Sequence, residues 1–154
     1  WIEISPQSGT FVKGLTAKEI AEILETRLVL ESYLAGLAAQ RMSDAELRRL
    51  RAAFRAFGTR VTRARIDAYF ELDLMFHMAI YDAAGNELIA RILLNLIDKI
   101  RWIRRSNGIS TERFQVALHE ILEVLRALEA RDGKAAAASM RAHINNARIF
   151  RRIG

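Results

Sequence analysis

The sequence predicts an all-α protein, an antiparallel bundle of about six helices preceded by a short β-hairpin. Ala, Leu, Ile, Arg and Glu dominate the 154 residues, and Pro, the residue that helices tolerate least, occurs once. From residue 16 onward, apolar residues recur at intervals of three and four, which is typical of helices with one buried face. The length suits one domain with a sizeable core.

Residues 1–14 differ from the rest of the chain. Ile2 and Ile4 alternate with polar residues, residues 6–9 (Pro-Gln-Ser-Gly) are typical of a turn, and residues 10–12 (Thr-Phe-Val) are β-branched or aromatic. This pattern predicts a β-hairpin. Because a lone hairpin is marginally stable in water, we expect residues 1–14 to be the end and linker of a preceding domain. Residues 15–154 then form the helical domain.

Capping and break signals divide the helical part. Thr16 to Glu19 and Ser43 to Glu46 are capping boxes, and they begin helices that run to about residue 42 and to residue 57. Glycines at 58, 85 and 108 end helices. The remaining helices are expected at about 64–84, 87–105, 111–131 and, from an Asp132 cap, to 152. In the helix at 87–105, the expected buried stripe is Leu88, Ile92, Leu96, Ile100 and Ile103.

Composition excludes several classes of function. The net charge is +6, but the arginines are scattered along helices without aromatic residues between them, which favours solvated helix faces over a nucleic-acid surface. No run of about 18 apolar residues is available for a membrane span. No Gly-rich phosphate loop or nucleophile motif occurs, and the absence of cysteine excludes disulfides and thiolate sites. We expect a soluble, cytoplasmic protein.

Residues 69–80, YFELDLMFHMAI, hold the most informative pair. Asp73 and His77 are four residues apart, about one helical turn, so they share a face that is otherwise apolar. A buried carboxylate beside a buried imidazole needs partners, and either a divalent metal or a hydrogen-bond network can supply them. The other histidines of the chain are His119 and His143, and His143 also falls on the apolar face of its helix.

Arg27 and Glu31 interrupt the apolar face of the first helix. They can form an internal ion pair, or the arginine can be available to an anionic ligand. The sequence alone leaves both interpretations open.

Four groups of residues together resemble one known family. They are residues 5–12; Arg27, Leu30 and Glu31; Phe70, Asp73, Phe76, His77, Ile80, Ala83 and Asn86; and Arg131-Asp132-Gly133 with Met140-Arg141-Ala142-His143-Ile144. Their spacing resembles the ligand-binding C-terminal (FCD) domain of GntR-type bacterial transcription regulators, in the FadR subgroup. Residues 5–12 resemble the last hairpin, or wing, of that family's winged helix-turn-helix domain.

The resemblance implies a metal site. In metal-binding members, an Asp and three His hold a divalent ion, here expected to be Zn²⁺, whose remaining positions take water or an effector carboxylate. Asp73, His77 and His143 match three of these positions, but the fourth corresponds to Ile121. His119 lies two residues away, a rotation of about 200° on a helix. Either the helix brings His119 in, or at most three ligands remain; a metal-free polar network is the alternative.

The resemblance also implies an effector-sensing domain rather than an enzyme. A small carboxylate would bind in the bundle, and a homodimer would bind operator DNA through an N-terminal domain absent from this chain. We expect Arg27 and Arg101 to contact the effector, and Asn86 and Asn146 to line its pocket. The alternatives are a metal-dependent enzyme, for which Glu31 is the only candidate general base, and a dimerisation domain without an open pocket.

Overall fold

The computed structural model describes residues 2–5, 9–12, 14–106, 108 and 110–152, and the side-chain surroundings of residues 14–106, 108 and 110–147. It confirms the predicted all-α class and the hairpin. Strands β1 (Ile2–Ser5) and β2 (Gly9–Val12) are antiparallel, with Ile2 opposite Val12. Residues 6–8 of the expected turn lie outside the described residues. The origin of the hairpin in a preceding domain stays a prediction.

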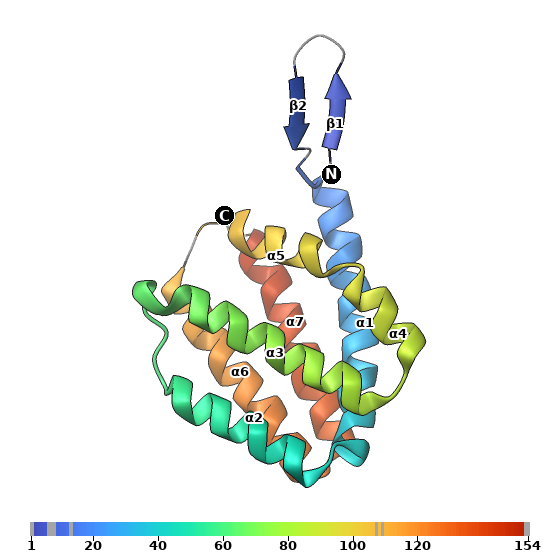
Figure 1. Cartoon of the computed structure of the whole chain (residues 1–154), viewed down its shortest axis with the longest axis vertical. Coiled ribbons are helices and arrows are strands. Elements are labelled where there is room, and N and C mark those ends of the chain that lie inside the picture. The colour runs from blue at the N-terminus through green and yellow to red at the C-terminus, as the bar shows by residue number, and fades with distance from the viewer. Residues whose placement is uncertain (1, 6–8, 13, 107, 109, 153–154) are drawn as a thin grey trace.

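The helical part contains seven α-helices among the described residues, one more than expected (Figure 1). They are α1 (Ala17–Arg41), α2 (Asp44–Phe57), α3 (Ile66–Ala84), α4 (Glu87–Leu94), α5 (Ile97–Ser106), α6 (Thr111–Glu129) and α7 (Gly133–Arg152), and the short 3₁₀ helix η1 (Arg63–Arg65) precedes α3.

The predicted boundary signals act as expected. The side chain of Thr16 accepts a hydrogen bond from the backbone N–H of Glu19, and the Glu19 carboxylate accepts one from the backbone N–H of Thr16. The second capping box at the start of α2 is complete in the same way. Gly85 ends α3 with φ 68°, a left-handed conformation that residues with a Cβ atom rarely adopt. Local sequence therefore determined where most helices begin and end.

The expected helix at 87–105 was wrong in one respect, because the chain turns at residues 95–96 and divides it into α4 and α5. Leu88 and Ile92, expected to be buried, are 67% and 41% exposed. Leu93 is fully buried instead, while Ile100 and Ile103 of α5 are buried as predicted. A single stripe cannot continue through a turn that changes the direction of the helix axis.

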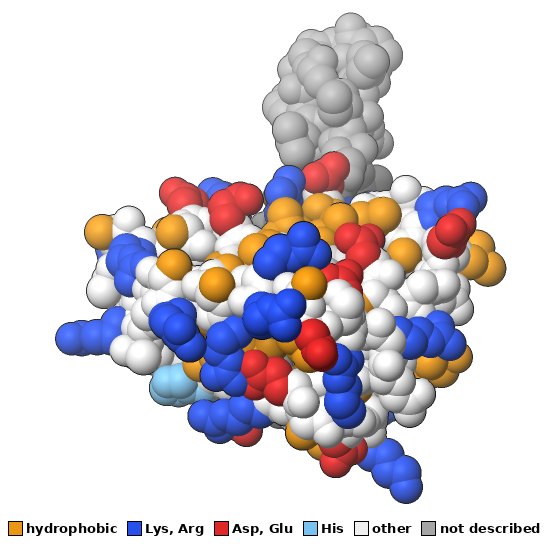
Figure 2. Space-filling view, turned by 60° about the horizontal axis from the view of Figure 1, so that its bottom comes forward, with side chains coloured by type: hydrophobic (Ala, Val, Ile, Leu, Met, Phe, Trp, Pro, Cys, Tyr) orange, Lys and Arg blue, Asp and Glu red, His pale blue; other side chains and the backbone are white. Residues whose placement is uncertain are grey.

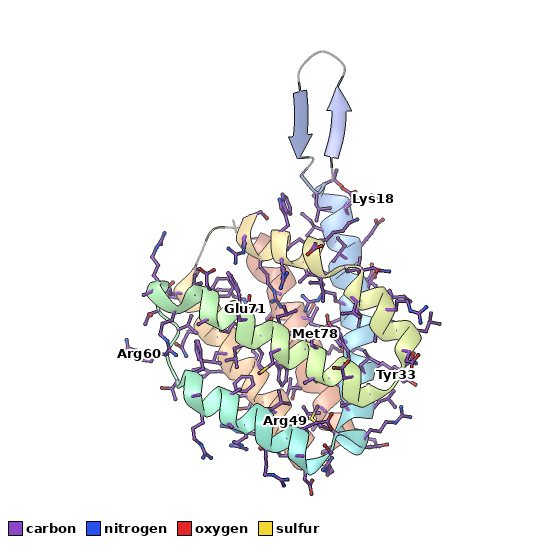
Figure 3. All side chains as sticks on the ribbon, in the orientation of Figure 1. Lys18, Tyr33, Arg49, Arg60, Glu71 and Met78 are labelled. Carbon is purple, nitrogen blue, oxygen red and sulfur yellow. The ribbon has the colours of Figure 1, made fainter. Side chains whose placement is uncertain are left out.

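The core lies between α1, α2, α3, α6 and α7, and α1 packs most extensively against α7. These two helices approach so closely that a Cβ atom on Gly133 would lie 2.9 Å from the Gly36 carbonyl oxygen. A smaller cluster joins the start of α1 to α5 and consists of Ile20, Ile23, Leu24, Ile100 and Ile103. Figure 3 shows the side chains filling the interior of the bundle. Helix α5 therefore packs against α1 through a hydrophobic cluster that is separate from the main core.

On the outside, Lys and Arg side chains are spread over the face in Figure 2, with acidic side chains between them. This distribution agrees with solvated helix faces. Within the described part of the chain, every helix is too short or too polar to cross a bilayer.

Candidate metal centre and ligand pocket

The fold brings together three of the residues that the sequence singled out. Asp73 and His77 lie one turn apart on α3, and His143 reaches them from α7. One donor atom of each side chain lies within 4.8 Å of the other two. The three residues are 1%, 3% and 5% exposed, and the two imidazole centroids are 5.6 Å apart. We call Asp73, His77 and His143 the Asp–His–His cluster.

A carboxylate lies against the Nδ1 atom of each histidine. His77 Nδ1 is 2.6 Å from Glu31 Oε2 of α1, and His143 Nδ1 is 2.9 Å from Glu120 Oε2 of α6. Carboxylates in this position fix the tautomer and orientation of metal-binding histidines, and they leave Nε2 as the ligand atom. The Nδ1 contact with Glu31 lacks hydrogen-bond geometry, so among the described residues neither buried ring nitrogen of His77 has a hydrogen-bond partner. The Nε2 atom lies 3.8 Å from Asp73 Oδ1.

The two oxygens of Asp73 face different groups. Oδ2 forms an ion pair with the Arg104 guanidinium of α5, whose side chain is 20% exposed, while Oδ1 faces His77. Burial by itself would raise the pKa of Asp73, but Arg104, His77 and His143 together hold that pKa below its usual value. Asp73 is therefore an anion that a cationic partner stabilises from one side.

His143, in contrast to the charged Asp73, is held in its neutral form. Burial lowers the pKa of His143, and the contact with Glu120 only partly counters that effect. The imidazole is therefore neutral near pH 7, the state in which it can act as a metal ligand. Burial would raise the pKa of Glu120, but its hydrogen bonds with His143 and Asn146 lower it, so Glu120 is ionised.

Arg27 and Glu31 form the internal ion pair that was one of the two interpretations of the sequence. Arg27 Nε donates to Glu31 Oε1 at 2.6 Å, and the side chains are 5% and 0% exposed. Burial would raise the pKa of Glu31, but Arg27 and His77 lower it far below the usual range. Glu31 thus connects the guanidinium of Arg27 to the ring of His77.

Two adjoining cavities open beside the cluster, with volumes of about 220 Å³ and 170 Å³. Arg27, Asp73, Ile100 and Arg104 line both of them. The larger, polar cavity is also lined by Phe70, Glu71, Leu74, His77, Tyr81, Ile97, Arg101 and Arg105. The smaller cavity is mainly apolar, with walls from α1, α3, α5, α6 and α7. Figure 3 labels Glu71, which marks the α3 side of the polar cavity.

His119 does not join the cluster. It is exposed, and its Nε2 atom lies 3.4 Å from Gln115 Nε2 on the same helix. Ile121 is fully buried, so the rotation that would have brought His119 inward does not occur. The reason is the apolar stripe of α6, in which Leu118, Ile121 and Leu125 are at most 1% exposed. Turning His119 inward would expose these side chains to water.

The structure places the other expected effector-binding residues, Asn86, Asn146 and Arg101, in three different surroundings. Asn86 does not line either cavity, because its side chain accepts a hydrogen bond from the Ile89 backbone N–H and caps α4. Asn146 donates to Glu120 Oε1 at 2.7 Å and acts on the cluster through that carboxylate. Arg101 lines the polar cavity, but its side chain is 51% exposed.

Sequence reasoning missed Arg104 and Glu120. Arg104 follows the buried Ile100 by four residues, so its position on the inward face of α5 was available as a signal. Glu120 is adjacent to the buried Ile121, and nothing local indicated that it would meet a histidine of α7. Arg113 also contacts Glu120, at 3.3 Å.

The donor set of the cluster fits a divalent metal. A carboxylate oxygen and two imidazole nitrogens are ligands that Zn²⁺ accepts, and three protein ligands leave a position for water or a ligand oxygen. Two donors of one tetrahedral zinc ion are about 3.3 to 3.6 Å apart, because each bond is about 2.0 to 2.2 Å long. Separations as long as 4.8 Å would therefore have to contract by about 1 Å on metal binding. The orphaned Nε2 of His77 supports the fit.

The fold is an all-α bundle with a buried Asp–His–His cluster beside two cavities. The family model for the FCD domain matches residues 22–146. The chain belongs to this family, and its homologues are GntR-type transcription regulators rather than enzymes.

Two relatives illustrate this membership. The chain is 31% identical over 138 residues to the HTH-type transcriptional regulator LutR of Bacillus subtilis (strain 168), covering 84% of this chain and 60% of that protein. It is 25% identical over 146 residues to the HTH-type transcriptional repressor RspR of Escherichia coli (strain K12), covering 93% and 63%. The chain therefore spans less than two thirds of the length of either relative.

Solved structures show the same fold. E. coli McbR/YncC matches with a TM-score of 0.76 at 16% identity, over 99% of this chain and 78% of that chain. The Zn²⁺-bound FCD domain of TM0439 matches with a TM-score of 0.71 at 22% identity, over 90% and 94%. At these identities the likeness establishes the all-α fold alone.

Proposed function

We propose that residues 15–154 sense a small organic acid for a GntR-type transcription regulator of the FadR subgroup. The observation that carries this proposal is the pair of guanidinium groups, Arg27 and Arg104, that line both cavities beside the Asp–His–His cluster. Charge-assisted hydrogen bonds from arginine to a carboxylate are among the stronger polar interactions, and a poorly solvated site strengthens them. A carboxylate entering either cavity meets both arginines.

Asp73, His77 and His143 would hold a divalent metal, with Zn²⁺ as our first choice. A metal with an open position would supply a second attraction for the carboxylate of the effector. The Zn²⁺-bound FCD domain among the structural relatives supports this assignment. Glu31 and Glu120 would keep the two imidazoles oriented toward the ion through the Nδ1 contacts described above.

The arginines take different parts in this proposal. Arg104 is the principal contact for the effector, because it stands between the two cavities and reaches Asp73. Arg27 is held by Glu31 and adds positive charge from the α1 side. Arg101 attracts the anion at the exposed edge of the polar cavity, while Asn146 supports His143 through Glu120.

In the whole protein, we propose that residues 1–14 end a winged helix-turn-helix domain and lead into the sensing domain. A homodimer would bind operator DNA in the cytoplasm through two such domains. An effector changes DNA binding only if it favours one arrangement of the helices over another. The output would be a change in the spacing of the two DNA-binding domains, because dimer geometry sets half-site spacing.

Elemental analysis of the purified protein tests the metal. We expect close to one divalent ion per chain in the wild type and in His119→Ala, whose side chain is exposed, and little in His77→Ala. Melting curves recorded on the same samples establish that each variant is folded. Equal metal content in the wild type and folded His77→Ala would contradict the assignment.

Thermal shift against a panel of carboxylates tests the sensing function. Any ligand that binds only the folded state raises the melting temperature, and a concentration of 100 times Kd stabilises by about 2.7 kcal/mol. We expect a shift in the metal-loaded protein that shrinks with chelator and in Arg104→Ala. A panel that includes short and long acids and produces no shift at all would favour a dimerisation domain without an open pocket.

A further inference from the structure

The two cavities differ in chemistry although they meet at the same residues. The polar cavity has Asp73, His77 and three arginines besides Arg27 in its lining. The second cavity has an apolar wall of Leu24, Ile103, Phe114, Ala117 and Ile144, which come from α1, α5, α6 and α7. Its polar lining, besides the residues that the two cavities share, consists of Tyr69, Ser110, Arg113 and His143. An anionic group is favoured at the junction of the two cavities, beside Arg27 and Arg104, whereas the apolar wall has no polar group to bind it.

We propose that the second cavity receives the apolar body of the effector, so that the ligand is a monocarboxylate with a compact hydrophobic group. This inference rests on the proposed sensing function and specifies the class of acid. The carboxylate lies at the junction beside Arg104, and the hydrophobic group extends between α1, α6 and α7.

The apolar wall of the second cavity supports a ligand with one carboxylate. A second carboxylate placed against Leu24, Ile103, Phe114, Ala117 or Ile144 would lose its hydration, and these side chains offer no hydrogen-bond donor in return, which is costly. An aliphatic or aromatic group loses no hydrogen bonds there and removes apolar surface from water.

The volume of the second cavity limits the size of that group. An engineered apolar cavity of about 150 Å³ in another protein holds one benzene molecule. The second cavity, at about 170 Å³, therefore has room for one aromatic ring or a chain of about six carbons. The additional carbons of a longer chain would exceed this volume and find no further apolar wall inside the cavity.

The test is isothermal titration of the chain with acetate, butyrate, hexanoate, decanoate and phenylacetate. Each buried methylene should tighten binding roughly fourfold, following the transfer free energy of about 0.8 kcal/mol. We expect affinity to rise from acetate to hexanoate, to rise no further for decanoate, and to be high for phenylacetate. If no acid binds, the sensing function itself fails. If acetate binds and longer or aromatic acids bind no more tightly, only the present inference is overturned.

A matched pair of variants locates the hydrophobic group. Ala117, 4% exposed, lines the second cavity, whereas its neighbour Val116 is 43% exposed. Ala117→Leu should weaken phenylacetate binding at least tenfold and leave acetate binding within twofold, while Val116→Leu should change neither. Unchanged phenylacetate affinity in a folded Ala117→Leu would overturn the proposal. The chain-length series on the wild type decides the matter if this variant does not fold.

Discussion

Replacing Glu31 by Gln tests whether the buried charges around the site are as interdependent as the structure indicates. Glu31 is fully buried, and its two oxygens lie 2.6 Å from Arg27 Nε and 2.6 Å from His77 Nδ1. Glutamine keeps the size of the side chain and removes the charge. Burial favours loss of the Arg27 proton, but Glu31, Tyr81 and Asp73 together outweigh burial and raise the pKa of Arg27, so the arginine is charged. In Glu31→Gln, that charge loses its nearest anion.

The magnitude follows from the burial of the pair. Removing one partner of a buried ion pair costs about 3 to 5 kcal/mol, because the remaining charge is uncompensated. For a chain of this size, each kcal/mol lowers the melting temperature by about 2 to 4 °C, so the expected drop is about 6 to 20 °C. The double variant Arg27→Met with Glu31→Leu removes both charges and should recover most of this loss.

Urea denaturation followed by circular dichroism measures both variants, provided that unfolding is two-state. The control is Glu129→Gln, which breaks an ion pair with Arg51 whose side chains are 26% and 48% exposed. Such pairs contribute about 0 to 1 kcal/mol. A loss below about 1 kcal/mol in Glu31→Gln, or a double variant as unstable as the single one, would refute this account of the site.

Two further predictions concern the same network. Glu120→Ala should weaken metal binding by roughly 10- to 100-fold, because Glu120 orients His143. Competition with a chelator measures the metal affinity. The control is Glu123→Ala, whose side chain is 56% exposed, and an equal loss of affinity in that variant would contradict the prediction. The pKa of Glu31 is lowered in the folded protein from its ordinary value of 4.5. As the pH falls, Glu31 therefore takes up a proton in the unfolded chain before it does so in the folded one, and the free energy of unfolding should fall as pH drops below about 4.5. The Arg27→Met, Glu31→Leu double variant should show a shallower acid slope in urea titrations between pH 5 and pH 3, and a slope as steep as that of the wild type would contradict the assignment.

The local parts of the site were predictable because helical periodicity places residues four apart on one face. Asp73 with His77, and Arg27 with Glu31, are such pairs, and all four are buried as expected. The same local reasoning failed for α4 and α5. A helical stripe read across residues 95–96 assumed a continuous axis, so Leu88 was expected inside although it is exposed.

Contacts between helices were beyond local reasoning. Arg104 meets Asp73 and Glu120 meets His143 across different helices, and each pairing depends on how far one helix is rotated against another. The position of His119 also depends on the rotation of its helix, which here turns the histidine away from the site. The resemblance to metal-binding relatives suggested a third histidine, but the apolar face of α6 fixed the rotation and left His119 exposed.

The sequence by itself determined the helical class, most helix boundaries and the inward direction of Asp73, His77 and His143, because these depend on caps, breaks and periodicity within single helices. Only the tertiary structure decided which side chains face one another. It placed Arg104 against Asp73, put a carboxylate beside His77 and another beside His143, and formed a polar and an apolar cavity next to them. The physical reason is that rotation and distance between helices are set by the packing of the whole core, which no single helix encodes.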